Sequence, residues 1–137
     1  MPQPLSHAEI LEKLSACLVP ALGITAKEVT PDASLVDDLG AESIDMVDIV
    51  FRIRKEFGLH LDFADLQSAL YGGLSEAEFF DSNRSVTPAG LTRLQTLLPD
   101  FDPAAYHSGL SERHLYSLFR VRHLVELIAT RLEKMND

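Results

Sequence analysis

Apolar residues recur at helical spacing in several stretches of the chain, whereas the sustained alternation typical of strands is almost absent. A first helix is predicted from about Ser6 to Leu22, because Ser6 opens an S-x-x-E capping box in front of apolar positions three to four residues apart. Pro20 is expected to kink or end this helix, and Gly23 is a stop signal.

Residues 24–41 follow as a long loop rich in turn-forming residues, and a second helix is predicted from about Glu42 to Phe57, with Gly58 as its stop. The apolar residues of this helix form two stripes, about a third of a turn apart. One stripe contains Met46, Ile49, Val50, Ile53 and Phe57, and the other contains Ile44, Val47 and Phe51. One stripe is enough to pack a helix into a small core, so the second is either a partner surface or a wider core contact.

The stretch 62–110 is less regular, yet it carries too many apolar clusters for a solvated linker. Residues 75–80 are predicted to form a short helix. Thr87 with the proline after it marks another helix start, which a leucine stripe continues until Pro99 ends it.

The pattern as a whole predicts an all-α fold, most simply a small helical bundle. The last long helix is expected to begin between Ser111 and Val121 and to continue to Glu133. Leu91 and Leu94, from the less regular stretch, are expected to bury against the bundle, near the second or the last helix.

Length and charge narrow the function. The chain has 137 residues, which suits one domain, and a formal net charge of -9. Such acidity disfavours nucleic acids and anionic membrane surfaces as partners, because both need a basic face. It suits partners with basic patches, although acidic charge is more often only a matter of solubility.

Cys17 is the one cysteine, so no disulfide can form within the chain. It falls on the apolar stripe of the first helix and is interpreted as a buried core residue. The N-terminal segment has neither the basic start nor the apolar run of a signal peptide, and no stretch approaches the length of a membrane span. A cytoplasmic location is expected.

Ser43, in the stretch A-E-S-I-D, is the candidate functional residue. A serine near a helix start is most often an N-cap. Nucleophilic catalysis is disfavoured, because G-x-S-x-G is absent and the neighbours are carboxylates. The five histidines are scattered and none follows H-E-x-x-H, so neither a base nor a metal site is indicated. The third interpretation is a handle that another enzyme modifies with a phosphoryl group, which a helix N-terminus accommodates.

The segment 35–48, L-V-D-D-L-G-A-E-S-I-D-M-V-D, together with the helix-ending Phe57 and Gly58, resembles the phosphopantetheine attachment segment of acyl carrier proteins, D-x-L-G-x-D-S-L-D. The first helix with its loop, and the V-x-x-L-V-x-x-I pattern at 121–128, resemble the family's first and last helices. The resemblance covers most of 6–62 and 117–133.

The resemblance implies an all-α, acyl-carrier-like four-helix bundle in a single domain, with its core at 6–62 and 111–134. An extended, partly helical insert would occupy about 63–110. Ser43 would carry covalent phosphopantetheine, added by a phosphopantetheinyl transferase that uses coenzyme A and magnesium. The thiol of this arm would hold acyl groups as thioesters. The chain itself would be monomeric and would have no catalysis of its own.

The same resemblance implies a docking surface for the transferase and for acyl-loading and acyl-transfer enzymes with basic patches. Its expected residues are Glu42, Ile44, Asp45, Val47, Asp48 and Phe51.

Two features depart from the family pattern. The second half of the second helix, usually acidic, here reads Arg52, Arg54 and Lys55, and Asp48 with Arg52 forms an i,i+4 pair. These basic residues confine the acidic patch to the start of the helix. Alternatively, this half of the helix is only an ordinary solvated face. The second departure is the insert, which suggests a specialised carrier for unusual or long acyl chains in lipid or envelope biosynthesis.

Three alternatives of other classes stay open: a peptidyl or aminoacyl carrier, a helical interaction module that has lost the modification, and, more distantly, a serine hydrolase. The intact Ser43 argues against the second of these, and the absence of ester turnover would dispose of the third.

Overall fold

The computed structural model describes residues 5–98, 101–106 and 109–135. The chain divides into two compact units. We call residues 1–63 with 117–137 the bundle unit, and residues 64–116 the inserted unit. Regular structure in the described residues is helical, with only isolated β-bridges besides, so the predicted all-α class is confirmed. A single domain with an insert at about 63–110 stays a prediction.

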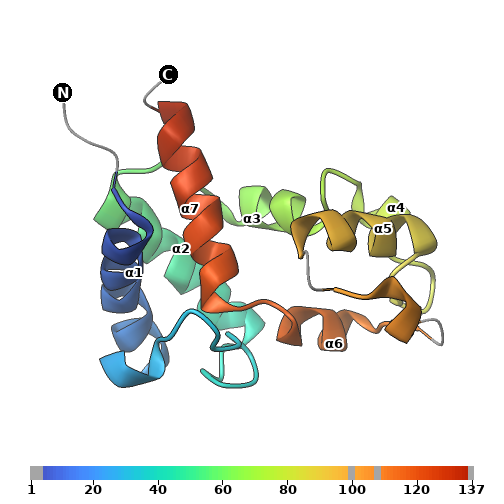
Figure 1. The fold of residues 1–137 in the computed structure, drawn as a ribbon, viewed down its shortest axis with the longest axis horizontal. Helices are drawn as coiled ribbons and strands as arrows, with labels where there is room; N and C mark the ends of the chain where they lie inside the picture. The colour runs from blue at the N-terminus through green and yellow to red at the C-terminus, as the bar shows by residue number, and fades with distance from the viewer. Residues whose placement is uncertain (1–4, 99–100, 107–108, 136–137) are drawn as a thin grey trace. The chain divides into compact units, whose positions relative to one another are not determined.

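The bundle unit is built from three long helices. Its elements are α1 (His7–Leu22), the 3-10 turn η1 (Ala26–Glu28), α2 (Ser43–Phe57) and α7 (Val121–Met135). The helix α1 packs against both α2 and α7 (Figure 1). The last helix begins at Val121, the end of the range 111–121 predicted for its start.

The ends of α1 follow the local signals in the sequence. The Ser6 hydroxyl accepts a hydrogen bond from the Glu9 N–H at 3.1 Å, and the Glu9 carboxylate accepts one from the Ser6 N–H at 3.0 Å. Gly23, with a φ of 66°, closes the other end. Pro20 does not end the helix, which continues to Leu22. Pro20 has no N–H, and because it lies in the last turn of α1, only one hydrogen bond of the helix is lost there.

The loop between α1 and α2 is held by residues distant in the sequence. The Ser34 hydroxyl donates to the Ser117 carbonyl at 2.9 Å, while the Ser34 N–H donates to the Asp38 carboxylate at 2.7 Å. The Leu35 N–H donates to the Phe119 carbonyl at 3.0 Å. The segment that precedes α7 therefore anchors the loop that leads into α2.

The inserted unit has short helices. They are α3 (Phe63–Leu70), whose first residue belongs to the bundle unit, α4 (Glu76–Phe79), α5 (Pro88–Leu97), the 3-10 turn η2 (Pro103–Tyr106) and α6 (Glu112–Ser117), whose last residue belongs to the bundle unit. The short helix predicted at 75–80 and the start of α5 after Thr87 are confirmed. Pro99 lies outside the described residues.

Aromatic rings form much of the core of the inserted unit. The Tyr71 and Phe79 rings stack with centroids 4.8 Å apart, and the Phe80 ring meets Phe79 edge-on at 5.0 Å. Burial raises the pKa of both Tyr71 and Tyr116, and the side chains of these two tyrosines are hydrogen-bonded to each other. The hydroxyl groups of Tyr71 and Tyr116 thus find their partners within the unit.

The leucines of α5 contribute to this same core. Leu94 is fully buried, whereas Leu91 is only partly buried. The helix α5 packs against α4 and η2, both in the inserted unit. The second and last helices, the packing partners expected from the sequence, belong to the bundle unit.

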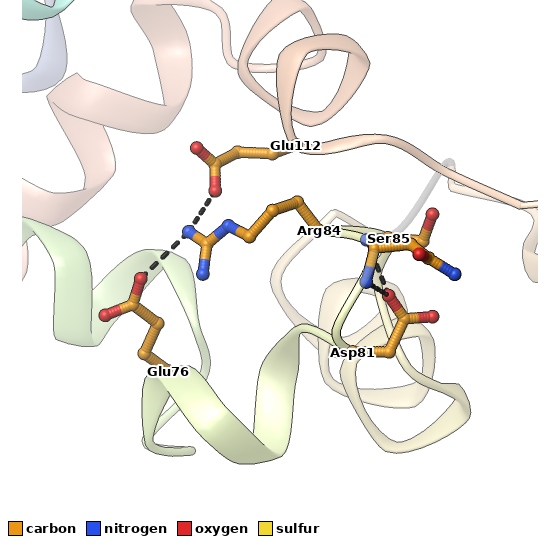
Figure 2. A network of polar contacts seen from close by, with 6 residues as sticks. Glu76, Asp81, Arg84, Ser85 and Glu112 are labelled. Atoms are coloured by element: carbon orange, nitrogen blue, oxygen red, sulfur yellow. Dashed lines mark hydrogen bonds and ion pairs between the residues drawn. The ribbon is translucent and has the colours of Figure 1, made fainter.

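One arginine ties three segments of the inserted unit together, as Figure 2 shows. The Arg84 guanidinium forms ion pairs with Glu76, at 2.8 Å, and with Glu112. It also lies over the Phe80 ring, 4.4 Å from the centroid. The Asp81 carboxylate closes the intervening turn by accepting from the Ser85 N–H at 3.0 Å. These ion pairs are exposed to solvent, so each contributes little to stability.

Candidate functional site

Ser43 is the first residue of α2, directly after the anchored loop. The Ala41 N–H donates to the Leu35 carbonyl at 2.8 Å, and Ala41 and Leu39 are both buried. Between them, Gly40 has a φ of 72°, a conformation that a residue with a side chain adopts only with strain. The backbone at Ser43 is therefore placed by the loop and its buried anchors.

Asp45 has a structural role that the sequence analysis missed. Its carboxylate accepts a hydrogen bond from the Glu42 N–H at 2.8 Å, which satisfies a donor just ahead of the first turn of α2. A carboxylate in the first turn also interacts favourably with the helix dipole. The signal was present in the sequence, because Asp45 lies three residues after the N-cap Glu42, as the acidic member of a capping box does.

The two apolar stripes of α2 have different environments. Ile49, Val50 and Ile53 of the first stripe are buried. In the second, which we call the apolar stripe, the exposed fractions are 74% for Ile44, 57% for Val47 and 54% for Phe51. The apolar stripe is thus not a wider core contact, and an exposed row of three large apolar side chains is typical of an interaction surface.

The exposed side of α2 changes its charge along its length. Glu42 is exposed at the start, and Asp48 pairs with Arg52 in the middle, with 3.1 Å between carboxylate and guanidinium, as the sequence predicted. Arg54 and Lys55 are exposed near the end. The net negative charge of this surface is therefore concentrated in the first half of the helix, since the exposed Glu56 near the end follows two cations in the sequence and pairs with Lys13.

Cys17 is buried on α1, as expected, and burial raises its pKa to about 11. Because the thiolate is the reactive form, we expect the unmodified chain to react with a thiol reagent near neutral pH only when denatured. The measurement is thiol titration of the unmodified chain with and without denaturant. A fast reaction of the folded, unmodified chain would contradict this expectation.

The described residues contain neither a candidate metal-binding cluster nor a candidate membrane span. No group of three or more His, Cys, Asp or Glu residues is placed there to hold a metal ion. Within the same residues, no helix combines the length and apolar character needed to span a bilayer.

Comparison with known proteins agrees with this geometry. Residues 12–84, more than half of the chain, match the family model described as the phosphopantetheine attachment site. An acyl carrier protein of Thermotoga maritima is 44% identical over 62 residues, which are 45% of this chain and 76% of that protein. An acyl carrier protein of Nitratidesulfovibrio vulgaris is 42% identical over 59 residues, which are 43% of this chain and 78% of that protein. The chain therefore belongs to the acyl carrier proteins, the family whose covalent cofactor is phosphopantetheine.

Proposed function

We propose that Ser43 is the residue to which the phosphopantetheine arm is joined. The observation that carries this proposal is the position of Ser43, which opens α2 at the end of an anchored loop and directly before the apolar stripe. The arm supplies a thiol that holds acyl groups as thioesters. The chain presents them to enzymes of fatty-acid, lipid or polyketide type, and has no catalysis of its own.

The residues at this site fit the chemistry of attachment. The serine oxygen forms a bond to phosphorus in coenzyme A, adenosine 3′,5′-bisphosphate leaves, and the serine proton passes to a base of the transferase. The product is a phosphodiester with one negative charge. The first N–H groups of a helix have no acceptor within the helix, and the dipole there favours an anion, so the start of α2 supports this charge. No base from this chain is required.

The apolar stripe and the acidic start of α2 would form the docking surface for the transferase and for acyl-transfer enzymes. Glu42 and Asp48 would meet basic partner residues, while Ile44, Val47 and Phe51 make apolar contacts. The compartment we propose is the cytoplasm, because the one cysteine rules out a disulfide within the chain. The inserted unit supports a specialised carrier, one that serves unusual or long acyl chains.

Incubation with coenzyme A and a broad-specificity transferase tests the proposal. We expect a mass increase of about 340 Da, the size of one phosphopantetheine group, which peptide mapping places at Ser43. An increment mapped to another residue would contradict the assignment.

The docking surface is tested by the rate of that reaction. We expect Glu42→Lys and Asp48→Lys to slow modification about two- to fivefold at low salt, because exposed charges act mainly on the encounter rate. High salt should remove the difference. Glu133→Lys, at an exposed position of α7, is the matched control. Asp45 is tested as Asp45→Asn, which keeps an oxygen able to accept from the Glu42 N–H. Rates that do not respond to ionic strength would count against electrostatic docking.

A further inference from the structure

A basic hollow lies at the end of α2. Its lining residues are Phe51, Arg54, Lys55, Gly58, Leu59 and His60. Phe51 supplies exposed apolar surface and Leu59 is almost fully buried, while Arg54, Lys55 and His60 are exposed and bear nitrogen donors. In a chain with a net charge of -9, two adjacent cations beside apolar side chains form a local environment suited to an anion with a carbon chain.

The cations of this hollow lack the acidic partners that neighbouring cations have. Arg52 pairs with Asp48, and Lys13 pairs with Glu56. Among the described residues, neither Arg54 nor Lys55 forms an ion pair with a carboxylate. The Lys55 ammonium lies 5.0 Å from the centroid of the Phe51 ring. Their charges are therefore available to a ligand.

The hollow lies on the same side of α2 as the attachment position. Arg54 follows Ser43 by eleven residues, which is about three turns and roughly 16 Å along the helix. The apolar stripe runs between them. The phosphopantetheine arm has about 13 bonds from phosphorus to sulfur, with a reach of roughly 15 Å by comparison with extended peptide. A short acyl group on the thiol covers the remaining distance.

We propose that this hollow binds the anionic end of the acyl group carried on the arm. The cargo is of the class that bears a carboxylate or a similar anion a few carbons beyond the thioester, as in a dicarboxylic acyl chain. Arg54 and Lys55 bind the anion, and Phe51 contacts the carbon chain. This inference rests on the proposed attachment at Ser43.

The tether favours a cargo over a separate partner at this place. Exposed ion pairs each contribute too little to recruit a dilute ligand. A ligand joined to the same helix by a short flexible arm is present at an effective concentration of about millimolar. At that concentration a contact with a dissociation constant of about 1 mM is occupied half of the time, so the two charge contacts and the apolar contact with Phe51 have to act together.

Two cargoes that differ in one charged group test the inference. The isotope-labelled carrier is loaded by the transferase from succinyl-coenzyme A or from butyryl-coenzyme A, which have acyl chains of equal carbon number. We expect the succinyl form to shift the amide resonances of residues 51, 54, 55 and 58–60, and the butyryl form to leave most of them in place. The difference should shrink at high salt, because the contacts are exposed.

Matched variants assign the effect to the basic residues. Arg54→Gln with Lys55→Gln should abolish the difference between the two cargoes. Arg54→Lys with Lys55→Arg keeps the charge and should retain it. Lys27→Gln with Lys134→Gln removes the same charge at exposed positions outside the hollow, and should also retain it.

Equal shifts for the two cargoes would overturn the inference. It would also be overturned if the glutamine pair slowed loading by the transferase while the cargo difference persisted, since the basic residues would then serve protein docking. Mass analysis precedes these measurements. Failure to find an arm at Ser43 would overturn the proposed function and the inference with it, and is thus distinguished from failure of the inference alone.

Discussion

Ser43→Ala is expected to abolish the mass increase of about 340 Da that a phosphopantetheinyl transferase produces on the parent chain. The reason is chemical, because alanine has no hydroxyl to form the bond to phosphorus. The loss should be complete, since a missing nucleophile cannot be offset by longer incubation. Intact-mass measurement after exhaustive reaction gives the result directly, and a surviving increment would refute the assignment of the arm to Ser43.

Two other serines provide the controls for this variant. Ser6→Ala removes the cap of α1 at an exposed position and should leave the modification intact, with a loss of stability of about 1 kcal/mol. Ser34→Ala should cost about 1–3 kcal/mol, because the Ser117 carbonyl and the Asp37 N–H lose their partner. Its loop leads into α2, so slower modification that still goes to completion is expected. Only Ser43→Ala should end the reaction.

Leu94→Ala is expected to destabilise the inserted unit by roughly 2–5 kcal/mol, the range for a fully buried leucine. Small units bury little apolar surface, and the core of the inserted unit contains the aromatic rings and Leu94. We therefore expect hydrogen exchange to accelerate at the amides of α4 and α5, while the amides of α1 and α2 keep their protection.

Leu91→Ala is the matched control on the same helix. Because Leu91 is only partly buried, the same truncation removes less apolar contact and should cost less than Leu94→Ala. Equal losses from both variants would contradict the packing described for α5. Random-coil exchange of amides 88–97 in the parent protein would mean that this segment is a flexible tether, and the prediction would be wrong.

The helix boundaries show how far local signals in the sequence reach. The capping box at Ser6, the start of α5 after Thr87 and the end of α2 at Gly58 were all predictable. Each depends on hydrogen bonds or backbone preferences within three to five residues, so the amino acids involved are neighbours in the sequence. Pro20 was expected to kink or end α1, and the helix continues past it to the predicted Leu22, because a proline in a last turn removes only one donor from the hydrogen-bond ladder.

The candidate site divides in the same way. The motif around Ser43 was legible because all of its members lie within one short segment. Asp45 was assigned to docking alone, although its carboxylate accepts from the Glu42 N–H. A carboxylate at this position can either cap the helix or face a partner, and the neighbouring residues do not distinguish the two roles. The periodicity of α2 showed two apolar stripes but could not show which of them the rest of the bundle covers.

The sequence by itself determined the all-α class, the starts of α1 and α5, the end of α2, and the segment that identifies the family. All of these depend on short-range chemistry. Only the tertiary structure decided that the apolar stripe is exposed, that α5 packs with α4 and η2, and that the loop before Ser43 is held by the segment that precedes α7. The bond from Ser34 to Ser117 joins residues 83 positions apart. Contacts of that kind depend on how separate helices pack, and no periodicity along the chain encodes which distant segment fills a given place.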